Sequence, residues 1–115
     1  MVLEIYKETR SFPSEEKFGI VSQIRKSASS ISTNIVEGHK RKSTKDYLHF
    51  LNMADSSLEE TKYLLLLSKD LTYLKESIFQ KLSFQCDEIG KMLSGLQKNL
   101  TPYTLSLTPT HAKKN

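Results

Sequence analysis

The titratable residues of this sequence do not have the spacing that catalysis requires. None of the three histidines, His39, His49 and His111, belongs to an HExxH pair, and no Glu-x-x-His motif predicts a di-iron site. The acidic pair Glu59 and Glu60 is typical of a solvated helix face. The four glycines are scattered and form no phosphate loop. We therefore expect a protein that is not an enzyme and that uses no metal and no cofactor.

The single cysteine, Cys86, excludes an internal disulfide scaffold. It lies on an apolar helical stripe, where a thiol behaves as a small apolar side chain of low reactivity. We therefore expect Cys86 to be a core residue and not a nucleophile.

The most distinctive polar feature is the basic run from His39 to Lys42, followed one turn later by Lys45. Six of the 17 Lys and Arg residues fall within residues 21–45, where Glu37 is the one acidic residue. Backbone N–H groups at the start of the next predicted helix would lie beside this run, which favours a phosphate site. The candidate nucleic-acid-binding residues are Arg25, Lys26, Lys40, Arg41, Lys42 and Lys45.

Arg25 and Lys26 precede the basic run by several helical turns. At 1.5 Å per residue they lie roughly 20 Å from it, a separation that would suit a nucleic-acid backbone or two unrelated surface charges. No aromatic residue interleaves the run, and Tyr47 has the spacing of a core residue, so base stacking and sequence-specific readout are not predicted. The alternative is that the run is a solvated loop that contributes only solubility.

Hydrophobic spacing predicts four helices that would position these residues. They cover about residues 2–10, 15–37, 44–70 and 75–100, with Ser14 as the N-cap of the second and either Ser43 or Thr44 as the N-cap of the third. Gly38 is expected to end the second helix in a left-handed conformation. The pair Thr101 and Pro102 is expected to end the fourth.

Each of the three longer helices carries an apolar stripe with spacings of 3 and 4 residues. Leu64 to Leu67 point in all directions around the third helix, so they predict either a central position in the bundle or a second face that packs on another subunit. The stripe residues are Phe18, Val21, Ile24, Ala28, Ile31 and Ile35; Tyr47, Leu51, Ala54, Leu58, Thr61 and Leu65; and Phe79, Leu82, Cys86, Ile89, Leu93, Leu96 and Leu100.

The chain of 115 residues is long enough for one domain with its own core. The pattern predicts an all-α protein, an antiparallel up-down four-helix bundle with a short first helix over residues 1–100, followed by a mobile tail over residues 101–115. No apolar run approaches the length that spans a bilayer, and we expect a soluble, cytoplasmic protein.

Several segments carry a resemblance to a known family. They are Ser22 to Arg25 (SQIR), Ser32 to Gly38 (STNIVEG), Tyr47 to Leu51 and Ser57 to Glu60. With them, the chain resembles the bacterial four-helix-bundle proteins named after intervening sequences in 23S ribosomal RNA. That family includes relatives of the accessory variability determinant of diversity-generating retroelements.

The resemblance implies a homopentameric bundle with a positive surface suited to nucleic acid, which in the retroelement relatives serves RNA and a reverse transcriptase. It assigns Arg25 to a basic position and Glu37 and Gly38 to a structural turn. The leading hypothesis is a non-enzymatic, oligomeric, nucleic-acid-associated bundle, with RNA favoured over DNA. The alternative is a protein–protein adaptor that binds a partner through Leu64 to Leu67 and the tail.

Overall fold

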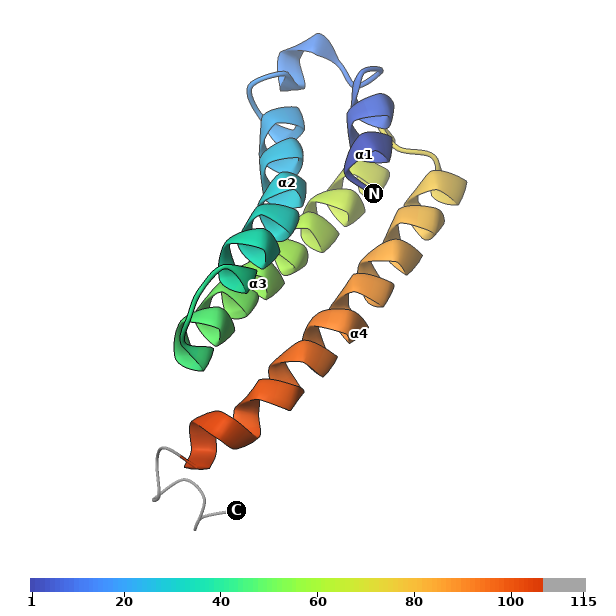
Figure 1. Cartoon of the computed structure of the whole chain (residues 1–115). Helices are drawn as coiled ribbons and strands as arrows, with labels where there is room; N and C mark the ends of the chain where they lie inside the picture. The colour runs from blue at the N-terminus through green and yellow to red at the C-terminus, as the bar shows by residue number, and fades with distance from the viewer. Residues whose placement is uncertain (107–115) are drawn as a thin grey trace.

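The computed structural model describes residues 1–106, and it describes the side chains of residues 1–100. Its elements are α1 (Val2–Thr9), the short 3-10 helix η1 (Ser14–Glu16), α2 (Ile20–His39), α3 (Thr44–Asp70) and α4 (Glu76–Ser106) (Figure 1). Over these residues the fold is all-helical, as predicted, and α1 is short. None of the helices described has the length and apolar composition needed to cross a bilayer.

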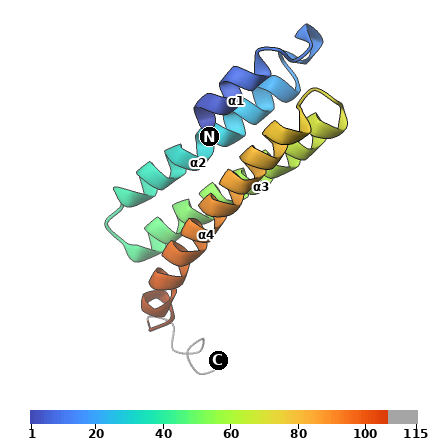
Figure 2. The same cartoon turned by 90° about the vertical axis from the view of Figure 1, so that its right-hand side faces the viewer.

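The helices run up and down in an elongated bundle of 53 × 25 × 18 Å. The long helix α3 packs against both α2 and α4, and α1 packs against the end of α2 that is remote from the α2–α3 loop (Figures 1 and 2). Side chains also join α1 to α4, because the Nζ atom of Lys81 lies 3.2 Å from the Oε1 atom of Glu4. This hydrogen bond lowers the pKa of the Glu4 carboxyl.

The core follows the predicted stripes of α2, α3 and α4. In α3, Leu51, Ala54, Leu58, Thr61 and Leu65 are all buried, as the spacing predicts. In the run from Leu64 to Leu67 the first two side chains are buried, Leu67 is half-buried and Leu66 is 43% exposed. Most of this run therefore belongs to the chain's own core, because α2 and α4 cover α3 from two sides.

The start of α2 differs from the prediction. Residues 14–16 form η1, and α2 begins only at Ile20, after Gly19 with φ −106° and ψ −114°. These dihedral angles lie outside the helical region, so the chain changes direction at Gly19. Phe18, which was expected in the core, is consequently 89% exposed.

Gly38 also has a different role from the one predicted. It is not in a left-handed conformation but lies within α2, buried where α2 meets α3. A Cβ atom at this position would lie 2.8 Å from the Cβ atom of Phe50 and 3.0 Å from the Cδ1 atom of Tyr47. Glycine is therefore required by the close approach of two helices and not by a turn.

Of the two cap candidates for α3 the structure selects Ser43, whereas α4 does not end where it was predicted to end. The Ser43 hydroxyl accepts a hydrogen bond from the Asp46 N–H at 3.0 Å. Helix α4 continues past Pro102 to Ser106, because a proline removes one N–H donor while the N–H groups that follow still find acceptors one turn back. Residues 101–106 of the expected tail therefore belong to α4 in the structure, and residues 107–115 lie outside the described residues.

Candidate nucleic-acid interface

The basic residues predicted from the sequence lie in two places at opposite ends of α2. Arg25 and Lys26 lie near its start, beside α1, whereas Lys40, Arg41 and Lys42 follow its end. Lys26 and Lys40 are separated by about 20 Å along the helix axis, at 1.5 Å per residue. The structure thus keeps the two clusters apart, with the outer surface of α2 between them.

Arg25 is engaged within the protein. Its Nε atom donates to the Thr9 Oγ1 atom at 2.9 Å, and its Nη2 atom donates to the Tyr6 carbonyl at 3.2 Å. Its guanidinium carbon lies 4.5 Å from the centroid of the Tyr6 ring. These contacts tie α1 to α2 and use two of the five guanidinium donors.

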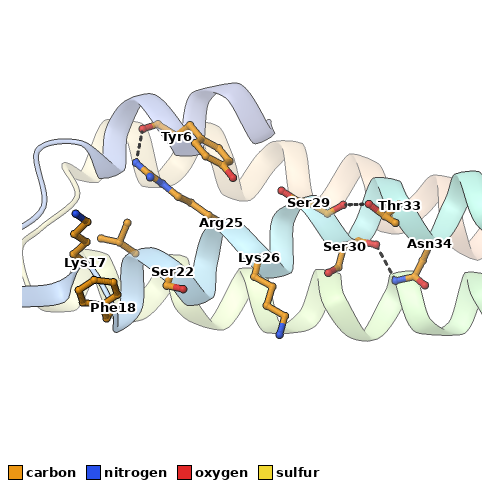
Figure 3. Close-up of a pocket in the computed structure, with 11 residues that line it drawn as sticks. Tyr6, Lys17, Phe18, Ser22, Arg25, Lys26, Ser29, Ser30, Thr33 and Asn34 are labelled. Atoms are coloured by element: carbon orange, nitrogen blue, oxygen red, sulfur yellow. Dashed lines mark hydrogen bonds between the residues drawn. The ribbon is translucent and has the colours of Figure 1, made fainter.

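Lys26 is oriented differently from Arg25. In Figure 3, Arg25 points toward α1, whereas Lys26 points to the opposite side of α2. Lys26 is exposed and, within residues 1–106, makes no ion pair. Of Arg25 and Lys26, Lys26 is therefore the residue whose ammonium N–H groups are all available to a ligand.

In the loop cluster, Arg41 also has partners inside the molecule. Its Nη2 atom lies 3.1 Å from the Oε1 atom of Glu37, and its guanidinium lies 4.6 Å from the Phe50 ring centroid. Lys40, Lys42 and Lys45 are exposed, and no ion pair is formed by them in the described part of the chain. Among the described residues, the loop and the first turn of α3 thus present three ammonium groups without an ion pair, and Arg41 neutralises Glu37 beside them.

An open groove of about 570 Å³ runs along α2 beside α1 (Figure 3). Three of its lining residues, Lys17, Arg25 and Lys26, are cationic, and none is acidic. The remaining lining residues supply two aromatic rings, one aliphatic side chain and a row of small polar groups: Tyr6, Phe18, Val21, Ser22, Ser29, Ser30, Thr33 and Asn34.

The polar groups in this groove are partly occupied by their own helix. Thr33 donates from Oγ1 to the Ser29 carbonyl at 3.0 Å, and Asn34 donates from Nδ2 to the Ser30 carbonyl at 2.8 Å. The amide of Asn34 is thus engaged with the backbone of its own helix. The hydroxyl oxygens in the groove still have acceptor capacity.

A smaller depression of about 260 Å³ adjoins this groove and shares Lys17 and Arg25 with it. It adds Arg10, and its lining also contains no carboxylate. On η1, the carboxylate of Glu16 accepts a hydrogen bond at 2.9 Å from the hydroxyl of Tyr73. That hydrogen bond raises the pKa of the Tyr73 hydroxyl.

Sequence reasoning missed Arg10, Lys17 and Phe18 as members of this surface. The apolar spacing of α2 extends back through Phe18, so the ring was assigned to the core. Gly19 was the available indication that the helix begins later, because glycine weakens a helix interior and permits a change of direction.

The described residues contain no cluster of metal-binding side chains. Within residues 1–106, no three His, Cys, Asp or Glu side chains come close enough to hold an ion together. Cys86 is buried as predicted, and burial raises the pKa of its thiol to about 11. Its Sγ atom lies 3.5 Å from the Sδ atom of Met1.

Comparison with known proteins relates the chain to one family. Residues 1–95 match the family model described as 23S rRNA-intervening sequence protein. Among solved structures, the chain is similar to a protein of unknown function from the S23 ribosomal protein family of Bacteroides thetaiotaomicron VPI-5482, with 28% identity and a TM-score of 0.76. This similarity covers 84% of the present chain and 88% of the other. No curated protein matches the sequence.

Proposed function

Because this chain belongs to the 23S rRNA-intervening sequence protein family, we propose that it is a non-enzymatic protein that binds RNA through the phosphate backbone. One observation carries the proposal: the sequence from Lys17 to Val36 contains no Asp or Glu, and its outer surface holds a groove with three cationic side chains. A polyanion meets no repulsive carboxylate along this path.

The loop after α2 and the first turn of α3 add a second group of exposed cations at the other end of the same helix. Lys40, Lys42 and Lys45 have no competing ion pairs in the described structure, so phosphate groups would not have to displace an internal partner. With about 20 Å along the helix axis between Lys26 and Lys40, the two groups of cations together could contact several phosphates of one backbone. Such contacts give affinity without base specificity.

Fluorescence anisotropy of a labelled, structured RNA across a salt series tests this proposal. The variant is the triple substitution Lys40→Ala, Lys42→Ala and Lys45→Ala. The matched control removes the same charge from exposed positions on or next to α4: Lys75→Ala, Lys91→Ala and Lys98→Ala.

For the wild type we expect binding that weakens steeply with salt. The loop variant should bind more weakly. The slope of the logarithm of its binding constant against the logarithm of the salt concentration should be smaller in magnitude by about 0.7–0.9 for each phosphate that it no longer neutralises. The control should keep the wild-type slope. Absence of binding by the folded wild type at low salt, or equally weakened binding by the two variants, would contradict the proposal.

We also propose that the chain forms homo-oligomers, pentamers by family resemblance, through the face where α3 and α4 meet. Tyr63 is 61% exposed and Leu66 is 43% exposed, and both line a groove of about 390 Å³ together with Phe79. A face of this kind is typical of a protein interface. An adaptor function would use the same face for a different protein and would tolerate salt.

Light scattering coupled to size-exclusion chromatography separates these cases. If a second copy covers the face, Leu66→Glu should reduce the measured mass toward that of one chain. Leu3→Glu is the matched control, because Leu3 is 85% exposed on a different helix. A wild type that is monomeric at every concentration would contradict the homo-oligomer.

A further inference from the structure

Phe18 is the feature of the groove that phosphate binding alone does not explain. Its ring is 89% exposed and lies between η1 and the first turn of α2. Isolated exposed apolar residues are common on protein surfaces, so exposure alone means little. What distinguishes Phe18 is the chemistry of its neighbours.

One cationic group lies beside the ring, and two more line the same groove. The Nζ atom of Lys17 lies 5.6 Å from the ring centroid, and Arg25 and Lys26 line the same groove. Ser22 adds a hydroxyl one turn further along α2 (Figure 3). An aromatic ring beside cations and hydroxyls is the combination that single-stranded nucleic acid requires, with a base on the ring and phosphates on the cations.

We propose that Phe18 is a stacking platform for an unpaired base, and that Lys17 and Lys26 hold the phosphates on either side of that nucleotide. This inference rests on the proposed RNA binding and specifies its substrate class as a single-stranded segment. A base inside a duplex cannot present its face to a side chain, whereas an unpaired base can.

The groove is poorly suited to an apolar partner. Covering Phe18 with an apolar protein surface would also cover Lys17 and Lys26, and these charges would lose water without gaining a partner. A nucleotide offers a flat apolar ring and an anionic group together, so it satisfies both kinds of side chain.

The sequence contains no tryptophan, which allows a direct test. In Phe18→Trp the new indole is the sole one, and stacking of a base on it quenches its fluorescence. Phe84→Trp is the matched control, because Phe84 is 65% exposed on α4 and does not line the groove. The probes are a short adenine-rich RNA and the same RNA annealed to its complement.

We expect the single strand to quench Phe18→Trp strongly and Phe84→Trp weakly, and the duplex to quench neither strongly. Equal quenching of the two tryptophans by the single strand would overturn the stacking platform. Equal quenching of Phe18→Trp by the single strand and by the duplex would overturn it as well.

Affinity gives a second readout. Phe18→Ala should weaken binding of the single strand about tenfold, because the variant has no ring on which a base can stack. The salt dependence of binding should not change, because the variant keeps every phosphate contact. Phe84→Ala should have no effect, and Phe18→Tyr should restore most of the affinity. Because Phe18 is highly exposed, its replacement should not unfold the protein. Circular dichroism of Phe18→Ala checks that the variant is folded.

The two proposals fail in different ways. If Phe18→Ala binds as tightly as the wild type while the loop variant Lys40→Ala, Lys42→Ala, Lys45→Ala is weakened, the stacking platform is wrong and RNA binding stands. If Phe18→Ala changes the mass of the protein in solution but not its affinity for RNA, Phe18 contacts another protein and the inference is wrong. If the folded wild type binds neither the single-stranded RNA nor the duplex, then RNA binding and the stacking platform are both wrong.

Discussion

The guanidinium of Arg25 lies over the ring of Tyr6, with 4.5 Å between its carbon and the ring centroid, and this contact fastens α1 to α2. Two hydrogen bonds, to the Thr9 hydroxyl and to the Tyr6 carbonyl, support it. One wall of the candidate RNA groove therefore depends on a side chain whose main partners are inside the protein.

Replacing this side chain should destabilise the fold. For Arg25→Ala we expect the free energy of unfolding to fall by about 2 kcal/mol, because the variant lacks two partly exposed hydrogen bonds and one cation–π interaction. Urea denaturation followed by circular dichroism measures the change. Lys26→Ala is the control and should stay within about 0.5 kcal/mol of the wild type. Equal stability of the two variants would show that the Arg25 contacts contribute nothing.

Gly38→Ala should also destabilise the protein, although alanine favours helices by about 1 kcal/mol relative to glycine. The added Cβ atom would lie 2.8 Å from the Phe50 Cβ atom, which is fixed to the backbone of α3 and cannot rotate away. We expect a net loss of about 1–3 kcal/mol, measured by thermal or urea unfolding. Gly95→Ala, with no atom within 4 Å of its added Cβ, should instead be stabilising by about 0.5–1 kcal/mol. A stabilised Gly38→Ala would mean that α2 and α3 are not held at this distance.

The buried hydroxyls of Ser27 and Thr61 should be energetically coupled. Thr61 donates from Oγ1 to the Ser27 Oγ atom at 2.8 Å, between α2 and α3. Thr61→Val keeps the shape of the side chain but removes this bond and the 2.8 Å contact of the same hydroxyl with the Ser57 carbonyl, so we expect a loss of about 1 kcal/mol. In a double-mutant cycle with Ser27→Ala, the double variant should be less destabilised than the sum of the two single variants by about 1 kcal/mol. Strict additivity would contradict the hydrogen bond.

Cys86 should make stability fall at alkaline pH. Burial raises the pKa of its thiol from 9.0 to about 11, so between these values the unfolded state releases the proton while the folded state retains it. The unfolded state then binds fewer protons, and stability falls as pH rises through this window. Relative to Cys86→Ala, the wild type should lose about 1–2 kcal/mol between pH 9 and 11, measured by urea denaturation at each pH. Parallel pH profiles for the two proteins would mean that the thiol is not buried.

Local pattern was sufficient to predict most of the bundle. The apolar stripe of α3 identified its buried residues, and the serine before it identified the cap, because both depend on residues within one helix. Gly38 shows where such reasoning ends. A glycine near a helix terminus predicts a left-handed cap, whereas the actual reason lies in Phe50 and Tyr47 on the neighbouring helix.

The candidate site was predicted less completely than the fold. Lys26 and the loop lysines lie exposed as expected, since charged residues off an apolar stripe face water. Phe18 was misassigned because its spacing fits the stripe, while the break at Gly19 depends on backbone conformation. The pairing of Arg25 with Tyr6 joins residues far apart in sequence, and periodicity within a helix contains no information about it.

The short length of α1 has a consequence for how the groove behaves over time. An eight-residue helix is too short to persist in water alone, so α1 keeps its structure only while it is docked. Local opening should therefore begin at α1, and its amide hydrogens should exchange with solvent faster than those in the middle of α3. The groove thus has a stable wall on α2 and a labile wall on α1, and a ligand that bridges the two would slow hydrogen exchange in residues 2–9.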